Sequence, residues 1–252
     1  RVGVPVTDVQ SADCFESLAR LRRKLRSKEL RLLLLCDEVE ELIHLNRQDP
    51  SLLRKLRRAL QSREGIRSVL ASSSRLWRLA DAGEDTSPFL DGFTPPLSIG
   101  PLEASDARAL IRQTGLPEAT RPVLAEDDIE RIRELCGNHP YLIQTLCRRV
   151  LDSEGLDEAV EAVRNDRAVT FFFSVDFELL SDCEKEILRH LAATPEATDE
   201  TVTACLEEPE SSIGTSLANL HHLGLVRRDT GRRLVVGNQF LHWWLADAPN
   251  SP

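Results

Sequence analysis

The chain has 252 residues, of which 32 are lysine or arginine and 41 are aspartate or glutamate, so its formal net charge is −9 and its pI is about 5.3. This acidic balance argues against broad nonspecific binding to nucleic acid or anionic membranes, because both require a positively charged surface. No apolar run approaches the roughly 20 residues that cross a bilayer, and no signal peptide opens the chain. We therefore expect a cytoplasmic protein without membrane contact in this segment. Its length and 41% apolar content favour two or three modules.

The six cysteines lie at positions 14, 36, 136, 147, 183 and 205, without any CxxC spacing. Several fall on apolar helix or strand faces, so we expect reduced thiols that are buried as small apolar side chains. The sequence starts at Arg1 and contains no methionine, which leads us to expect a piece of a longer product.

Strands alternate with helices in the pattern predicted for residues 1–100, which is typical of a parallel α/β sheet. Residues Val2 to Val9 form the first predicted strand. Ser11 and Asp13 can then cap an amphipathic helix. The leucines of residues 52–60 indicate a second amphipathic helix.

Between these helices lies the run LRLLLLC, Leu30 to Cys36, which Asp37 and Glu38 follow directly. Such a short continuous apolar run predicts a strand that is buried on both faces. Ligand sites of parallel sheets form beyond the carboxyl ends of the strands. There an aspartate can hold Mg²⁺, and a glutamate can orient or deprotonate an attacking water. The alternative is that Asp37 caps the helix predicted for VEELIHL, because acidic residues favour helix N-termini.

A third predicted strand, Ile66 to Ala71, runs into a polar cluster of three serines and an arginine: Ser72, Ser73, Ser74 and Arg75. Hydroxyls at this edge can hold an attacking water or a phosphate oxygen, and an arginine can neutralise γ-phosphate charge. The alternative is a serine-rich turn in which Arg75 pairs with a surface acid.

Residues 76–96 lose periodicity and predict a long loop, of a kind that is often functional in compact domains. A short strand is predicted at Leu97 to Ile99, and residues 102–175 then favour a small helical domain. Within it, the run CGNHPYLIQTLC predicts a tight corner between two helices. Gly137 can end the first helix, Asn138 or His139 can cap the next, and Pro140 suits its first turn. With no second ligand nearby, His139 is interpreted as a capping or packing residue.

Residues 176–248 predict three helices, a hairpin and a last helix. The first helix opens at Ser181, the second spans Thr201 to Leu206, and the third carries Ile213, Leu217 and Leu220. The hairpin pairs residues 223–226 with 234–236. The ending FLHWWLA predicts an amphipathic helix whose tryptophans, Trp243 and Trp244, pack on the domain.

The order of these features resembles the AAA+ and STAND ATPases, which are related to the ATPases of origin recognition. LRLLLLCDE resembles the Walker B strand, VLASSSR the sensor 1 strand, and GNHP the lid motif of that family. IGPLEASDARALI is similar to the start of the lid helices. Residues 176–252 resemble a winged helix, the usual companion of these ATPases.

This resemblance implies ATP or ADP as ligand, with Mg²⁺. By position, Asp37 would hold the metal, Glu38 would be the catalytic glutamate and Arg75 would sense the γ-phosphate. Ser72 and Ser73 would belong to the phosphate side, and Pro140 would contact adenine. The implied fold is a partial P-loop NTPase α/β core over residues 1–100, an all-α lid domain over 101–175 and a winged-helix domain over 176–252.

The pattern GxxxxGK[ST] does not occur in the 252 residues, so the backbone cradle and the lysine that hold the phosphates are missing from this sequence. We expect the phosphate-binding loop to precede Arg1, and we expect the chain by itself to bind ATP poorly or not at all.

Two functional hypotheses follow from the sequence. The first is a nucleotide-controlled switch of a STAND-type ATPase, with protein partners or self-association through the core and the winged helix. The second is a non-catalytic pseudo-ATPase that serves as a protein-interaction or DNA-binding module. DNA is the less favoured partner, because acidic residues open the third helix of residues 176–248 and repel phosphate. Only the predicted wing is basic: Arg227, Arg228, Arg232 and Arg233.

Overall fold

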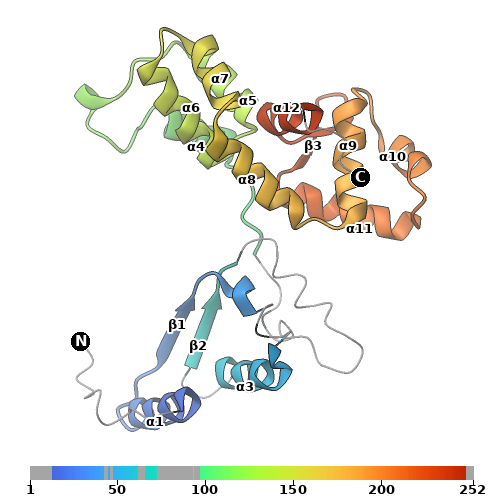
Figure 1. Cartoon of the computed structure of the whole chain (residues 1–252). Coiled ribbons are helices and arrows are strands. Elements are labelled where there is room, and N and C mark those ends of the chain that lie inside the picture. The colour runs from blue at the N-terminus through green and yellow to red at the C-terminus, as the bar shows by residue number, and fades with distance from the viewer. Residues whose placement is uncertain are drawn as a thin grey trace. The chain divides into compact units, whose positions relative to one another are not determined.

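The computed structural model describes residues 13–42, 45, 48–61, 66–72, 93 and 97–247. The chain forms two compact units, Arg1–Pro96 and Leu97–Pro252. Most of the described elements are helices, and the sheet of the first unit is small and parallel (Figure 1).

The first unit contains two parallel strands and the helices α1 and α3 among its described residues. Its elements are α1 (Cys14–Arg26), β1 (Leu32–Cys36), the 3₁₀ turn η2 (Val39–Glu41), α3 (Pro50–Leu60) and β2 (Ile66–Leu70). Both helices start at an aspartate. The side chain of Asp13 accepts a hydrogen bond from the backbone N–H of Phe15, and that of Asp49 from those of Ser51 and Leu52. The predicted cap at Asp13 is therefore confirmed.

Strands β1 and β2 pair in a parallel register that runs from Leu32 opposite Ile66 to Cys36 opposite Leu70. Side chains of a strand alternate between its two faces. One face packs with helix α3 into a small core in which Leu34 and Leu70 contact Leu53 and Leu60. The parallel pairing places both carboxyl ends at the same edge of the sheet.

The expectation that β1 is buried on both faces is wrong for the described structure. Leu33 is 58% exposed and Leu35 is 73% exposed, and Val69 of the neighbouring strand is 55% exposed. The physical reason is that α3 covers the face of Leu34 and Cys36. No described element packs on the other face.

Three other predictions of this region have different outcomes. The strand Val2 to Val9 lies outside the described residues, as does the loop of residues 76–96 apart from Phe93. The strand predicted at Leu97 to Ile99 is wrong, because these described residues form no strand. Leu97 is 94% exposed and Ile99 is 98% exposed, so neither end of the segment packs on a sheet.

The second unit begins with a group of helices that surround the predicted corner. They are α4 (Ala104–Ile111), the 3₁₀ turn η4 (Glu118–Thr120), α5 (Glu126–Cys136), α6 (Pro140–Asp152), α7 (Leu156–Arg164) and α8 (Arg167–Glu178). Helix α6 contacts α4, α5 and α7, and therefore lies at the centre of this group.

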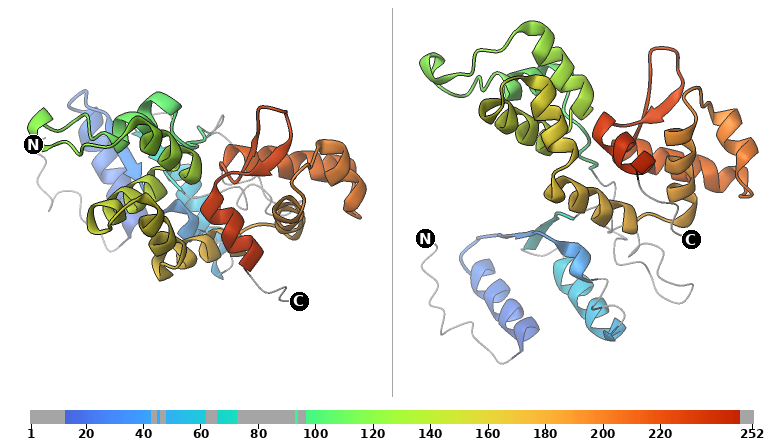
Figure 2. Two further views of the ribbon diagram at one scale, coloured as in Figure 1. Left: turned by 90° about the horizontal axis from the view of Figure 1, so that it is seen from above. Right: turned by 45° about the horizontal axis from the view of Figure 1, so that its top comes forward.

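The remaining elements follow the predicted order. They are α9 (Asp182–Ala193), α10 (Asp199–Cys205), α11 (Glu210–His222), β3 (Val226–Arg228), β4 (Leu234–Val236) and α12 (Gln239–Asp247). Ser181 caps α9 in a reciprocal pair with Glu184, as its position predicted. The hairpin is antiparallel and starts at Val226, later than predicted, and Figure 2 shows it beside α12.

A single core runs through the second unit, from Ala107 in α4 to Leu245 in α12. Trp243 and Trp244 pack against this core, as predicted. The expectation of buried cysteines holds for Cys136 and Cys183 and is wrong for Cys14 and Cys205, which are exposed near a helix start and at a helix end. Within the described ranges, no helix is long and apolar enough to span a membrane.

Candidate functional site

Beyond the carboxyl end of β1, the backbone hydrogen bonds to the residue that follows β2 are irregular. The backbone N–H of Ala71 donates to the carbonyl oxygen of Cys36 over 2.8 Å, and the carbonyl oxygen of Ala71 accepts from the N–H of Val39 over 3.1 Å. In a regular parallel ladder the two bonds of one residue reach partners that are two positions apart; here they are three apart. Asp37 and Glu38 therefore form a bulge, with one more residue than the ladder accommodates, and bulges of this kind are frequent next to active sites.

Glu38 absorbs the additional residue by adopting a left-handed backbone conformation, with φ 52° and ψ 42°. This conformation costs an ordinary L-residue about 1–2 kcal/mol relative to the right-handed one. Strained residues of this type occur preferentially at functional sites, where the surrounding structure holds them in place. The side chain of Glu38 is exposed, so the strain does not serve to bury it.

Asp37 presents an accessible carboxylate at this strand end. Its Oδ1 accepts a hydrogen bond from the N–H of Glu38 over 2.9 Å, and its Oδ2 has no hydrogen-bond partner among the described residues. The alternative role as a helix cap does not fit the geometry, because Glu38 holds the N-cap position of η2 and makes no side-chain cap bond. The oxygen of Asp37 thus remains available to a ligand.

The chemistry of this carboxylate fits Mg²⁺. The ion prefers oxygen ligands and usually keeps several waters, so one or two carboxylates together with phosphate oxygens suffice to bind it. No group of three or more potential metal-ligating side chains occurs among the residues that the structure describes. The fit is therefore to a metal that arrives with its own oxygen ligands, and not to an all-protein cage.

At the end of β2, the hydroxyl of Ser72 donates to Oε2 of Glu40 over 2.7 Å. This contact ties the strand end to η2, and it engages the hydroxyl that the sequence predicted for a water or a phosphate oxygen. Glu40 was not among the predicted site residues, although the run DEVEE contains it as an additional acid. Asp37, Glu38 and Ser72 do share one sheet edge, whereas Ser73 and Arg75 lie outside the described residues.

The predicted corner between α5 and α6 belongs to the second unit. Gly137 ends α5 in a left-handed conformation with φ 56°, as predicted, and Asn138 follows with φ 59°. His139 occupies the N-cap position of α6 without a side-chain cap bond, and Pro140 begins the helix. The corner leaves Pro140 at a fixed position in the first turn of α6.

His139 is a packing residue in this corner. Its ring lies 5.5 Å from the ring of Phe172 in α8, between centroids, and its Nδ1 is buried without a hydrogen-bond partner. Burial lowers the pKa of His139, which favours the neutral imidazole.

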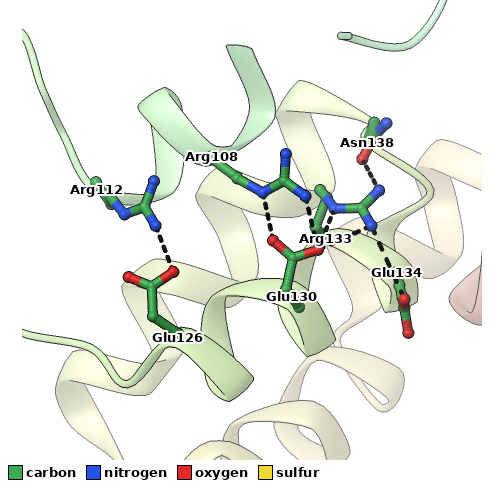
Figure 3. Close-up of polar contacts among 7 residues, drawn as sticks. All are labelled: Arg108, Arg112, Glu126, Glu130, Arg133, Glu134 and Asn138. Carbon is green, nitrogen blue, oxygen red and sulfur yellow. Dashed lines mark hydrogen bonds and ion pairs between the residues drawn. The ribbon is translucent and has the colours of Figure 1, made fainter. Parts of the chain in front are cut away.

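An ion network that the sequence analysis did not predict supports the same corner (Figure 3). Glu130 of α5 accepts hydrogen bonds from Arg108 of α4 and from Arg133, and the Nη1 of Arg133 donates to the side-chain oxygen of Asn138 over 3.4 Å. The bond from Arg108, together with Arg133, lowers the pKa of Glu130 to about 2. The network therefore links α4, α5 and the left-handed Asn138.

The arginines near the hairpin are only partly available to a ligand. Arg228 donates to Asp199 over 2.9 Å, and Arg233 pairs with Asp229 over 2.7 Å and with Glu196 over 3.5 Å. Within residues 97–247, Arg227 and Arg232 are exposed and form no ion pair. Half of the predicted basic wing is thus neutralised by acids of the same unit.

Comparison with known proteins finds likeness in structure and none in sequence. No protein-family model matches the chain, and no curated protein matches it. A Walker-type ATPase of Pyrococcus abyssi superposes with a TM-score of 0.57 and 16% sequence identity, over 94% of this chain and 69% of that chain. The ORC2 protein of Aeropyrum pernix, solved in ADPNP and ADP complexes, gives a TM-score of 0.46 and 18% identity over 97% and 72% of the two chains. The chain therefore shares the fold of a Walker-type ATPase.

Proposed function

We propose that the chain is the regulatory switch module of a STAND or AAA+ type ATPase, which binds and hydrolyses ATP and passes the change of nucleotide state to attached domains. The observation that carries this proposal is the bulge at the end of β1, which holds Asp37 and the left-handed Glu38 at the edge where parallel sheets bind ligands. The shared fold with a Walker-type ATPase supports it.

In this proposal each residue of the first unit has a separate role. Asp37 would hold Mg²⁺ through its free oxygen, and the ion would supply neutralisation of phosphate charge. Glu38 orients the attacking water and accepts its proton. Arg75 and Ser73 act on the γ-phosphate side. The hydroxyl of Ser72 positions η2 through its hydrogen bond to Glu40, and it also holds a water or a phosphate oxygen.

The second unit contributes Pro140, which we propose as the contact to adenine, within a helical lid over residues 101–175. The following elements α9 to α12 have the order of a winged helix, which we propose as the part that passes the signal on to a protein partner or to another copy. The phosphate-binding pattern GxxxxGK[ST] is absent from the 252 residues, so full affinity requires such a loop from elsewhere in the natural protein.

The test measures MgATP binding and hydrolysis by the full-length natural protein. Asp37→Asn should weaken Mg²⁺-dependent binding, because one metal ligand loses its charge. Glu38→Gln should keep binding and lose hydrolysis, because an amide accepts no proton. Asp127→Asn, at an exposed carboxylate of α5, serves as the matched control. Unchanged hydrolysis in both site variants would remove the assignment.

A second function, a non-catalytic interaction module, is favoured by the neutralised wing. Arg228 and Arg233 are already paired with acids, which leaves two exposed arginines for phosphate and makes a protein partner the better candidate than DNA. This hypothesis predicts that the full-length natural protein binds no nucleotide. Titration with a labelled DNA duplex at several salt concentrations separates its two forms, since a DNA-binding wing would give a steep loss of affinity with salt.

A further inference from the structure

Four backbone segments of the second unit meet in a closed ring. They are the start of the unit, the corner between α5 and α6, the turn between α11 and β3, and the turn between β4 and α12. Each contributes one residue that has no room for a larger side chain or that closes the contact: Pro101, Gly137, Gly224 and Gly237. We call these four residues the glycine ring.

The backbones in the glycine ring touch directly. A Cβ atom on Gly137 would lie 2.1 Å from the carbonyl oxygen of Gly237, and one on Gly237 would lie 1.9 Å from that of Gly224. A Cβ on Gly224 would lie 2.4 Å from Cγ of Pro101. Carbon atoms without a bond between them settle at about 3.5–4.0 Å, so none of the three glycines can be replaced without moving a neighbouring backbone segment or the ring of Pro101.

Hydrogen bonds close the ring between segments that are far apart in sequence. The N–H of Gly237 donates to the carbonyl oxygen of Leu225 over 2.7 Å, and the N–H of Leu102 donates to that of Asn138 over 3.0 Å. Gly137 and Gly224 have φ values of 56° and 71°, which glycine adopts without strain. Both the backbone conformation and the close contacts therefore favour glycine at Gly137 and Gly224.

Other contacts join residues 101–175 to residues 176–247. Helix α8 runs without interruption from Arg167 to Glu178, across the predicted boundary between residues 175 and 176. Arg164 of α7 donates to Asp247 of α12 over 3.0 Å, and its guanidinium lies 5.2 Å from the ring centroid of Trp243. One hydrophobic core extends through both halves.

We propose that residues 101–247 move as one rigid body. In this proposal the contacts of the glycine ring hold residues 101–175 and residues 176–247 in one fixed orientation. A ligand or partner that reorients the corner with Pro140 then reorients helices α9 to α12 by the same rotation. The inference goes beyond the proposed nucleotide switch and does not depend on it, because it concerns how any motion is transmitted within this unit.

The test is a distance measurement between two spin labels by pulsed electron paramagnetic resonance. One label is attached to native Cys205 of α10, which is exposed, and the other to position 127 of α5 through Asp127→Cys. Cys14→Ser and Cys36→Ala remove the accessible thiols of the first unit. Cys147 reacts slowly, because burial raises its pKa to about 11 and labelling requires the thiolate.

We expect one narrow distance distribution in this parent protein. Gly137→Ala should broaden it or add a second distance, because its methyl group would lie 2.1 Å from the carbonyl oxygen of Gly237 and would force the α5–α6 corner away from the turn between β4 and α12. The matched control is Gly214→Ala, where a Cβ meets nothing within 4 Å, and it should leave the distribution unchanged. Arg164→Ala should also leave it narrow, since the ring and the core remain.

A broad distribution in the parent protein would overturn the rigid body. A distribution that stays narrow in folded Gly137→Ala, or that broadens in Arg164→Ala, would overturn the role of the glycine ring. If Gly137→Ala does not fold, Gly224→Ala, whose Cβ would lie 2.4 Å from Cγ of Pro101, takes its place with the same expected and contradicting outcomes.

Discussion

The N–H of Val39 donates to the carbonyl oxygen of Ala71 over 3.1 Å, in the place where a regular ladder would use the N–H of Glu38. Because Cys36 already accepts from the N–H of Ala71, the two residues between Cys36 and Val39 form a bulge. The cost of this arrangement is the left-handed backbone at Glu38, and the result is a pair of accessible carboxylates at the strand end.

Replacing Glu38 by glycine should raise the free energy of unfolding by about 0.5–1 kcal/mol. Glycine adopts the left-handed conformation without the clash of a Cβ atom, although it also gains freedom in the unfolded chain. Urea denaturation of the first unit measures the change. Glu29→Gly is the matched control, because Glu29 is also exposed and left-handed, with φ 55°, but lies outside the site. Both variants should be stabilised, and only Glu38→Gly should lose ATP hydrolysis. A destabilised Glu38→Gly would contradict the strain at this position.

Ser72→Ala should destabilise the first unit by about 0.5–1.5 kcal/mol, the usual contribution of one hydrogen bond. The hydroxyl bond to Glu40 over 2.7 Å, which ties the end of β2 to η2, is lost. Thermal unfolding compares this variant with Ser98→Ala, an exposed serine in the connection to the second unit. Equal melting temperatures of the two variants would show that the contact of Ser72 with Glu40 contributes nothing.

Acid should weaken the second unit through Glu130. Its pKa is lowered from 4.5 to about 2 by Arg108 and Arg133, so the folded state holds the carboxylate in its charged form. A lowered folded pKa stabilises the protein above the unfolded value of about 4.5, and this contribution is lost as the pH falls from about 4.5 toward 2.

Glu130→Gln should therefore show a smaller loss of stability over this pH range than the wild-type protein. Melting temperatures measured at intervals between neutral and acidic pH test the difference. Glu118→Gln is the control, because Glu118 is exposed and forms no ion pair within residues 97–247. If the curves for wild type and Glu130→Gln run in parallel, the network does not depend on the charge of Glu130.

Charge reversal should change stability to a different extent at two neighbouring arginines of the hairpin. Arg228→Glu places a carboxylate against Asp199 and should destabilise the second unit by up to about 1 kcal/mol, since exposed ion pairs contribute little. Arg227→Glu should leave stability unchanged, because Arg227 has no acidic partner among the described residues. Urea denaturation measures both, and the difference should shrink at high salt. A larger effect of Arg227→Glu would contradict the assigned pairs.

Local chemistry predicted much of this structure correctly. Asp13 and Ser181 cap helices, Gly137 ends one and Pro140 starts the next, because the hydrogen bonds and the allowed backbone angles involved lie within a few residues. The order of strands and helices around Asp37 and Glu38 followed from the same reasoning. The roles of Asp37, Glu38, Ser72, Ser73, Arg75 and Pro140 in an ATP site remain predictions.

Local chemistry could not predict which faces are covered. The leucines of β1 all look alike in sequence, yet Leu34 packs against α3 while Leu33 and Leu35 are exposed. The exposure of Cys205 could not be predicted for the same reason, since an apolar pattern does not say which element packs on it.

By itself, the sequence determined the order of most of the described elements, several helix ends and which carboxylates follow the first described strand, because turn, cap and periodicity preferences act between near neighbours. Only the tertiary structure decided the left-handed bulge at Glu38, the bond from Ser72 to Glu40, the pairing of Arg108 with Glu130 and the glycine ring. Each of these joins residues from different elements, and the free energy of such a contact depends on the backbone positions that the whole fold imposes.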